Sequence, residues 1–441
     1  MRTNRNTVLW MYALGYFGIS IFTQTTVKWY QYFYAPPDVN VSGLRVLIPL
    51  SLIGITMVVA RIFDGLADPI VAHLSDNCRS RLGRRIPFIL YGSVPLTLSF
   101  IAIWFPPVNG ESIWNFVYLT VVLVLFFIFF TVVVAPYLAL IGEVSENRVE
   151  RIKLTTMQGV TQVLGVMVAE VGSGAIIHMS NFKVMGISLG LVSLITIMLT
   201  PLFVREEKIA PSEEQVGMIS SIKMTLNNSY FINYLVSYLM IWFGINSLTI
   251  AMPYITEILL GETAEMSGFL IAGAFVVTIV VSPFIPKLVI KLGKKRVMEL
   301  THLVLGVILC SMFLFGTLIN GWAAYILIFA AGIPLAITFI VPNAMVADIA
   351  EWDGLVTGQR REGMFFGAQG LIIKIVIGIS SLVTPFIFDI FGYTKDNPLG
   401  LKLIGPIAGI IALAGIFFIR RYGLTEQQLE DRKRLTSPQK Y

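Results

Sequence analysis

The fold is decided by stretches such as residues 113–140, which read IWNFVYLTVVLVLFFIFFTVVVAPYLAL and contain no Asp, Glu, Lys or Arg. A helix needs about 20 consecutive apolar residues to cross the hydrocarbon layer of a bilayer. This stretch is therefore long enough to span a membrane as one helix. The whole chain has 56% hydrophobic and 13% charged residues, whereas soluble domains have about 25% charged residues. We predict a polytopic membrane protein.

Similar apolar stretches recur along the whole chain and predict about twelve spanning helices. We place them at 7–34, 44–72, 86–106, 113–140, 154–178, 184–204, 229–257, 266–286, 297–317, 321–347, 363–390 and 399–419. The first stretch is too long for the apolar part of a signal peptide, so we interpret it as the first span.

Lysine and arginine residues are concentrated on one side of the predicted spans. Of the 32 in the chain, 25 fall in alternate connections and the two termini, whereas only Lys183 and Lys395 lie in the opposite connections. Because basic loops stay in the cytoplasm, both termini are predicted to be cytoplasmic. Topology thereby explains the net charge of +6, and we expect no nucleic-acid partner.

The two halves of the chain carry related segments. RLGRR at 81–85 and KLGKK at 291–295 are offset by 210 residues, as are Arg151 and Arg361. Duplicated six-helix units are typical of the major facilitator fold, which is an all-α membrane fold of two bundles. The predicted domains are an N-terminal six-helix bundle at 1–204, a cytoplasmic linker at 205–228, a C-terminal six-helix bundle at 229–420 and a cytoplasmic tail at 421–441.

The second predicted span contains RIFDGLADP at 61–69, with three charged residues. Each charge inside a bilayer costs about 2.5–3.5 kcal/mol, so such residues indicate function. Asp64 and Asp68 share one helix face with Arg61. Two carboxylates one turn apart repel each other unless a cation lies between them. One arginine neutralises only one acid, so we predict a site for Na⁺, Li⁺ or H⁺; a structural Arg–Asp pair is the alternative.

Three further charged residues in the predicted spans are candidates for a role in function. Lys374, in the middle of the eleventh, is predicted to face a central cavity near Asp64, with a structural role as the alternative. Glu170, deep in the fifth, either binds substrate or protons or caps a polar patch between helices. Lys28, near the end of the first, is predicted to extend outward to the membrane interface.

Catalytic and metal-binding motifs are absent from the sequence. There is no phosphate-binding G-x-x-x-x-G-K-[ST] loop, no HExxH and no GxSxG. The three histidines are scattered, and the two cysteines are too few for a metal cluster. We therefore predict a protein that is not an enzyme, with no cofactor and no metal beyond a transported cation.

Longer motifs carry a resemblance to a known family. They are RIFDGLADP followed by SRLGRRIPF at 80–88, VADIAEWDGLVTGQRREGMFFGAQGLIIK at 346–374, and the tail from GPIAG at 405 to LEDRKR at 434. Together they extend over nearly the whole chain. The chain resembles the glycoside–pentoside–hexuronide:cation symporters, the melibiose permease-like family of the major facilitator superfamily.

The resemblance implies uptake of a sugar or glycoside coupled to Na⁺, Li⁺ or H⁺. It implies that Asp64, Asp68 and Thr131 bind the cation, and that Lys374 couples the cation and sugar sites. We also predict a coupling role for Arg61, which lies beside the acids. The family's galactoside-binding groups are replaced here, for example by Ser20 and Val134, so we expect a different solute. Candidate substrate-cavity residues are Ser20, Gln24, Val134, Gln158, Glu170 and Trp242.

Two six-helix bundles that rock around a midplane site require contacts that close the cytoplasmic end. The candidate cytoplasmic gate residues are Asp76, Arg79, Arg84, Arg85, Arg360, Arg361 and Glu362. The alternative is that these basic loops only set the topology.

The sequence thus predicts a secondary active transporter, a cation-coupled symporter that works by alternating access. Its partners would be a small polar solute and the lipid bilayer, and we expect a monomer in the bacterial inner membrane, with multiple passes. A lysolipid or amphiphile carrier of the same fold and a non-transporting sensor are the alternatives.

Overall fold

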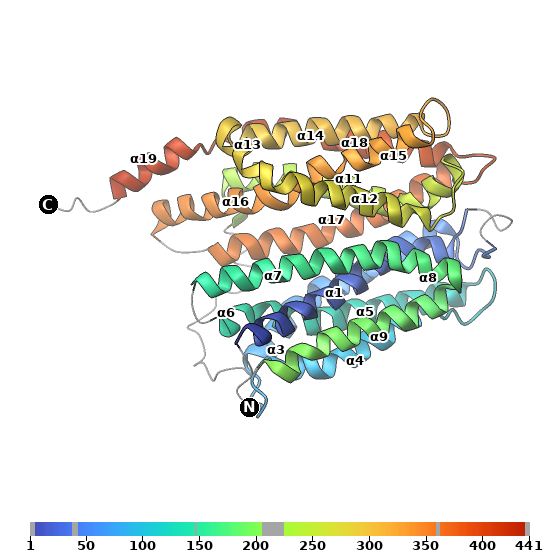
Figure 1. Cartoon of the computed structure of the whole chain (residues 1–441), viewed down its shortest axis with the longest axis horizontal. Coiled ribbons are helices and arrows are strands. Elements are labelled where there is room, and N and C mark those ends of the chain that lie inside the picture. Colours follow the sequence, from blue (N-terminus) through green and yellow to red (C-terminus); the bar gives the residue numbers. More distant parts are fainter. Residues whose placement is uncertain (1–4, 38–42, 146–147, 205–224, 359–361, 437–441) are drawn as a thin grey trace. The chain divides into compact units, whose positions relative to one another are not determined.

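The computed structural model describes residues 5–37, 43–145, 148–204, 225–358 and 362–436 (Figure 1). Within these ranges the chain is helical, with no strand apart from an isolated bridge between Phe315 and Ile319. The first helices are α1 (Arg5–Tyr34), α3 (Leu50–Asp76), α4 (Ile86–Ala102), α5 (Ile113–Ala139), α6 (Ile141–Val144), α7 (Arg148–Met167), the π-helix η1 (Val168–Gly172), α8 (Ser173–Met179) and α9 (Phe182–Phe203).

The later helices begin with α11 (Ser229–Tyr254), the π-helix η2 (Ile255–Leu259), α12 (Met266–Val281), the 3-10 helix η3 (Ser282–Phe284) and α13 (Ile285–Leu292). They continue with α14 (Lys294–Ser311), the 3-10 helix η4 (Met312–Leu314), α15 (Trp322–Ala330), α16 (Gly332–Thr357), α17 (Glu362–Phe391), α18 (Leu399–Arg421) and α19 (Glu426–Thr436).

Ten helical segments of the described chain are long and apolar enough to cross a membrane. Two more helices bring the number to the predicted twelve: α4, an apolar helix of 17 residues, and α1, with 30 residues. The C-terminal part of α1 reads TQTTVKWYQYFY, which lowers its hydropathy. The predicted fold class, an all-α membrane protein of about twelve helices, is confirmed.

Four of the predicted helix boundaries are wrong by more than five residues: α7 begins at Arg148 rather than 154, the segment that starts with α12 continues to Leu292 rather than 286, and two others are decided by single residues. The second span begins at Leu50 rather than 44, because Pro49 precedes it and disfavours helical backbone in the residue before it. The tenth span continues to Thr357 rather than 347. It ends where Gly358, with φ of 73°, adopts the left-handed conformation that terminates helices.

The chain divides into two compact units. Unit 1 comprises Met1–Glu213, Thr249–Ala272 and Ser381–Leu401. Within it, α1 packs against α7 and α9, α4 packs against α5 and α9, and α5 packs against α3 (Figure 1). Small residues allow the helices to approach closely: a Cβ on Gly165 would lie 2.4 Å from the Phe17 carbonyl oxygen. This packing brings α3 and α5 side by side.

Unit 2 comprises Glu214–Leu248, Gly273–Ser380 and Lys402–Tyr441. Its helices α14 and α16 pack together. A buried His302 on α14 contacts the Ser237 hydroxyl of α11 at 2.5 Å and the Ala412 carbonyl oxygen of α18 at 2.7 Å, and so joins three helices. The predicted division into an N-terminal bundle at 1–204 and a C-terminal bundle at 229–420 is inferred from duplicated segments in the sequence. It stays a prediction.

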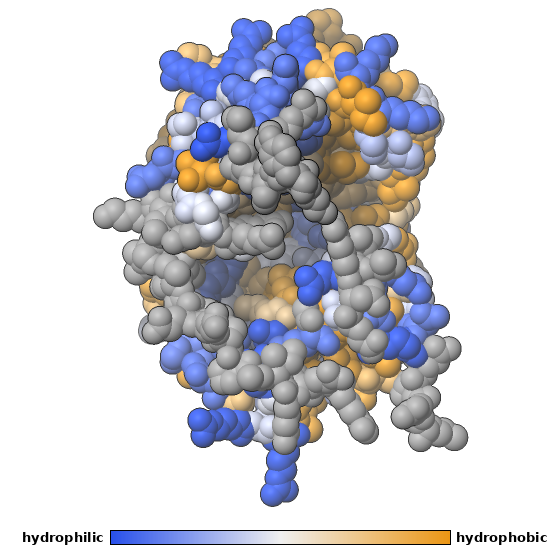
Figure 2. Space-filling model, turned by 90° about the vertical axis from the view of Figure 1, so that its left-hand side faces the viewer, coloured by the Kyte–Doolittle hydropathy of each residue, from blue (hydrophilic) through white to orange (hydrophobic). Residues whose placement is uncertain are grey.

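Apolar side chains cover the outer faces of the helices. On α3, Ile62, Leu66 and Ile70 are more than half exposed, while Asp64 on the opposite face is fully buried. Apolar side chains face outward and the charged side chain faces inward, which is the reverse of the pattern in a water-soluble protein. Such a pattern is expected where lipid surrounds the protein. Figure 2 views the molecule along its length, and hydrophilic side chains gather on the face that it draws. The burial pattern of α3 thus turns its acids toward the protein interior.

Candidate functional site

The candidate site lies between α3 and α5 in unit 1. Asp64 and Asp68 are one turn apart on α3, and Thr131 projects from α5. The Thr131 hydroxyl Oγ1 lies 2.6 Å from Asp64 Oδ1 and 3.3 Å from Asp68 Oδ1. Two carboxylates that are separate along the helix therefore converge on one hydroxyl oxygen. The structure brings together the three residues for which the sequence predicts cation binding.

Arg61 supplies the positive charge of this site. Its Nη1 lies 3.2 Å from Asp64 Oδ2, and its guanidinium lies over the Phe127 ring at 4.0 Å. Asp64 is fully buried, and Asp68 is partly buried. Hard cations prefer oxygen ligands of the kind that the two carboxylates and the Thr131 hydroxyl provide.

Lys374 lies in α17, where it is partly buried, and belongs to unit 2. The prediction that it faces Asp64 joins residues of different units and stays a prediction. Its role in coupling likewise stays a prediction.

Of the predicted substrate-cavity residues, Gln24 and Glu170 are in direct contact. Gln24 Nε2 donates to Glu170 Oε1 at 2.7 Å. Ser20 and Gln158 are buried, and the Ser20 hydroxyl bonds the Tyr16 carbonyl oxygen of its own helix. Val134 is partly buried on α5. These five residues belong to unit 1.

Trp242 belongs to unit 2, where it lies in a row of aromatic rings. Its ring centroid is 6.2 Å from that of Tyr238, and 6.2 Å from that of Phe339. Tyr238 in turn stacks on Tyr234, whose hydroxyl donates to Gln369 Oε1 at 3.2 Å. Aromatic faces next to an amide are groups with which a polar ring compound can stack and form hydrogen bonds.

The prediction for Lys28 is wrong. Rather than extending to the membrane interface, Lys28 is fully buried, and its Nζ lies 2.9 Å from Glu170 Oε2. Glu170 is equally buried and lies on the π-helix η1. For Glu170, the contacts agree with the second interpretation, a polar contact between helices. Gln24 and Lys28 are four residues apart and share a helix face, which was the available signal for a common partner.

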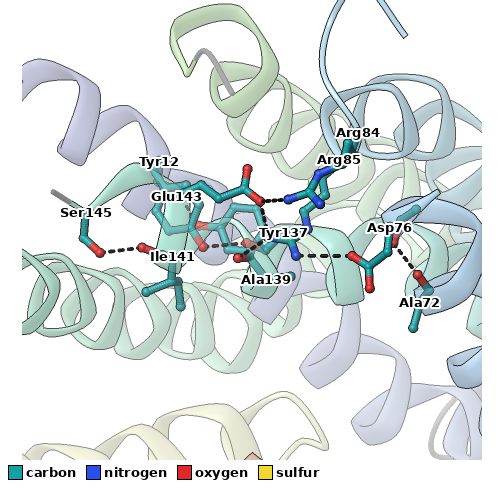
Figure 3. Close-up of polar contacts among 11 residues, drawn as sticks. Tyr12, Ala72, Asp76, Arg84, Arg85, Tyr137, Ala139, Ile141, Glu143 and Ser145 are labelled. Carbon is teal, nitrogen blue, oxygen red and sulfur yellow. Dashed lines mark hydrogen bonds and ion pairs between the residues drawn. The ribbon is translucent and has the colours of Figure 1, made fainter. Parts of the chain in front are cut away.

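The predicted cytoplasmic gate contains a cluster of ion pairs around one acid (Figure 3). Arg84 and Arg85 both approach Glu143 Oε1 at 2.7 Å. Arg85 also pairs with Asp76 Oδ1 at 3.3 Å and donates to the Ala139 carbonyl oxygen at 2.6 Å. The loop after α3 is thereby attached to the α5–α6 segment. Sequence reasoning missed Glu143, because it lies 59 residues from Arg84 and in no shared motif.

The remaining gate residues are described only in part. Arg79 is exposed after α3. Arg360 and Arg361 lie outside the described residues, and so does the side chain of Glu362. Their role as gate residues stays a prediction.

A bundle of apolar helices with acids turned inward is typical of a membrane transporter. The chain belongs to the family described as MFS/sugar transport protein, whose family model matches residues 11–425. This membership confirms the resemblance seen in the motifs at the level of the superfamily.

Several symporters are similar to this chain over most of its length. The putative glycoside/cation symporter YagG of Escherichia coli is 23% identical, with 95% of this chain and 92% of YagG covered. The inner membrane symporter YicJ of Escherichia coli is 23% identical, with coverage of 87% and 86%. The sodium-dependent lysophosphatidylcholine symporter 1 of Gallus gallus is 23% identical, with coverage of 86% and 81%.

The fold is similar to that of the nucleoside transporter NupG, with a TM-score of 0.70 at 10% identity, over 95% of this chain and all of NupG. At that identity the likeness concerns the fold alone. Together with the spanning helices, the family confirms a multi-pass protein of the inner membrane. A transporter in a membrane carries a small solute as its partner.

Proposed function

We propose that this transporter is a symporter that couples a monovalent cation, Na⁺, Li⁺ or H⁺, to uptake of a sugar or glycoside. The observation that carries the proposal is the convergence of the Asp64 and Asp68 carboxylates on the Thr131 hydroxyl, which gathers three oxygen-bearing side chains at one point inside a spanning bundle. The name of YagG, a putative glycoside/cation symporter, agrees with it.

The proposed cycle begins with the cation, which binds the three oxygen-bearing side chains and offsets negative charge of the two acids. An uncompensated charge is costly to enclose in a membrane protein, so only the empty or the fully loaded carrier would change conformation readily. Cation and solute then raise each other's affinity by the same factor, as thermodynamic linkage requires. In this proposal no cofactor takes part.

The sugar side of the proposal rests on groups suited to an uncharged polar ring. Ser20 and Val134 provide no carboxylate, so a galactoside is not the expected solute. The Trp242 ring and its neighbour Tyr238 offer faces for stacking. Lys374 would connect the solute with the cation site.

The test is thermal stability of the purified protein in detergent, titrated with Na⁺, Li⁺ and K⁺ at several pH values. A cation at 100 times its Kd stabilises the folded protein by about 2.7 kcal/mol. We expect a saturable rise with Na⁺ or Li⁺ that is lost in Asp64→Asn and Asp68→Asn, and retained in the control Asp396→Asn, an exposed loop acid.

A response to pH alone, lost in the same two variants, would identify the coupling ion as H⁺. No response to metal ions or to pH would contradict the proposal.

The second candidate is a cation-coupled lysolipid carrier. It is favoured by the similarity to a sodium-dependent lysophosphatidylcholine symporter and by apolar side chains at Val134 and Leu138. Stabilisation by lysophosphatidylcholine below its micellar concentration, with no effect of any sugar or glycoside, would favour this candidate over the first.

A further inference from the structure

A second charged site, separate from the Asp64–Asp68 pair, lies between α1 and η1. The Lys28 and Glu170 side chains are both fully buried, and Lys28 Nζ lies 2.9 Å from Glu170 Oε2. Lys28 Nζ also donates to the Glu170 backbone oxygen at 3.0 Å, and Gln24 donates to the carboxylate at 2.7 Å. We name Lys28 and Glu170 the buried charge pair.

The buried charge pair is unlike a contact that serves only stability. Removing two charges from water costs more than their attraction returns in many proteins, so apolar residues of similar size are often at least as stabilising. The glutamate also lies on a π-helix, a distortion that is frequent at functional sites. These two features indicate that the pair serves a movement or a binding event.

The first turn of α12 covers the buried charge pair. A Cβ on Gly268 would lie 1.9 Å from the Glu170 backbone oxygen and 3.0 Å from Lys28 Nζ, so no larger residue fits. Ser267, beside it, is fully buried. The backbone of α12 therefore keeps water away from both charges.

Two further contacts join the same segments of unit 1. The Tyr32 hydroxyl of α1 donates to Glu257 Oε2 on η2 at 2.5 Å. A Cβ on Gly174 of α8 would lie 3.0 Å from the Glu265 backbone oxygen, just before α12. The α1–η1–α8 segments and the η2–α12 segments are thus in contact around the buried charge pair.

A pocket of about 360 Å³ adjoins these contacts. It is lined by Tyr32, His178, Glu257 and Glu265 among others, so it extends to both of the additional contacts. Withdrawal of the η2–α12 segments would therefore open the pair toward this pocket. Apart from the two members of the pair, the charged group that acts on Lys28 from the segment before α12 is Glu265. Glu257 of η2 is connected to α1 through its hydrogen bond with the Tyr32 hydroxyl.

We propose that the buried charge pair is a conformational switch of the transport cycle, closed when the first turn of α12 covers it and open when that turn withdraws. In the closed state each charge has its partner without water. In the open state water hydrates both, and a hydrated pair holds α1 and η1 together only weakly. Both charges therefore have a partner or water in either state.

This inference depends on the chain being a transporter that changes conformation, and not on which cation or solute it carries. The experiment therefore uses neither. The reporter is Ser267→Cys, a nearly isosteric change at a fully buried position, in a chain in which Cys78 and Cys310 are replaced by Ser. The rate of its reaction with a small water-soluble maleimide in detergent measures how often α12 withdraws.

A reference rate for a fully accessible thiol comes from the same chain with Thr263→Cys instead of Ser267→Cys. Thr263 is exposed and lies near the start of α12. The reporter is then combined with Glu170→Gln, with Gly268→Ala, or with Lys28→Met and Glu170→Met together. The control is Gly172→Ala on η1, where a Cβ would meet nothing nearer than 3.5 Å.

We expect Glu170→Gln to raise the labelling rate at least about tenfold, because breaking one side of a buried pair is strongly unfavourable. We expect a similar rise for Gly268→Ala, because its Cβ would lie 1.9 Å from the Glu170 backbone oxygen and would push the first turn of α12 away. The double Met variant should label at least about threefold more slowly than the parent, because apolar side chains gain nothing from hydration. Gly172→Ala should label at the parent rate.

Two results would overturn the proposal. One is parental labelling in both Glu170→Gln and Gly268→Ala. The other is parental labelling in the double Met variant, which would make the pair a structural contact only. If Glu170→Gln does not fold, Gly268→Ala and the double Met variant decide, because neither leaves a charge without its partner. Absence of any sugar or cation response would leave these rates unchanged and would count only against the proposed function.

Discussion

The sharpest prediction concerns the hydroxyl that joins the two acids of α3. Thr131→Val keeps the shape of the side chain and removes Oγ1, which lies 2.6 Å from Asp64 Oδ1 and 3.3 Å from Asp68 Oδ1. Thr131 is buried, with 2% of its surface exposed, so water does not easily replace the hydroxyl. The substitution therefore tests the site with little change in packing.

The magnitude follows from the hydrogen bond to a charged group. Such a bond contributes about 1.5–3 kcal/mol, and each 1.4 kcal/mol is about a factor of ten in affinity. If the oxygen that bonds the carboxylates also binds the cation, Thr131→Val should weaken cation binding by about ten- to a hundredfold. Thr131→Ser, which keeps the oxygen, should bind within about threefold of the parent.

The assay is calorimetric or thermal-shift titration of Na⁺ and Li⁺ against the parent and both variants. Unfolding in the absence of cation provides the control for stability, since the loss of a bond to Asp64 also lowers the free energy of unfolding. Cation affinity in Thr131→Val equal to that of Thr131→Ser would refute the assignment of Thr131 to the site.

Three further predictions concern other parts of the chain. Asp68→Asn should abolish concentrative uptake while leaving expression intact, because the remaining Asp64 is already paired with an arginine; accumulation at the parental level would contradict the cation site. Lys374→Ala should uncouple cation flux from solute flux in proteoliposomes, and parental stoichiometry would show that the lysine is structural. Gly186→Ala should lower the midpoint of thermal unfolding, because its Cβ would lie 2.1 Å from Trp104 Cδ1; unchanged unfolding would mean that the indole moves without cost.

The fold was accessible from sequence because its signal is local. Each span is a run of apolar residues, and the number of spans follows from counting the runs. Boundaries were less accessible where a single residue decides them, as Pro49 does for α3 and Gly358 does for α16. Those residues act through backbone conformation, which hydropathy does not measure.

The candidate site was accessible in part. Asp64 and Asp68 stand out because a charge in a span is costly, and their shared face follows from helix geometry. Thr131 has no such signal of its own, since threonine is common in membrane helices, and it came from the family resemblance. The structure places its hydroxyl against both acids.

The sequence by itself determined the class of protein, the number of its spans and the α3 acids, because hydrophobic length and helical periodicity act between near neighbours. Only the tertiary structure decided which distant charges meet. Lys28 pairs with Glu170 across 142 residues, and Arg84 pairs with Glu143 across 59. Such partners depend on which helices pack together and in what register, and a π-helix such as η1 shifts that register locally. Hydropathy alone assigns Lys28 to the membrane interface, whereas packing buries it beside a carboxylate.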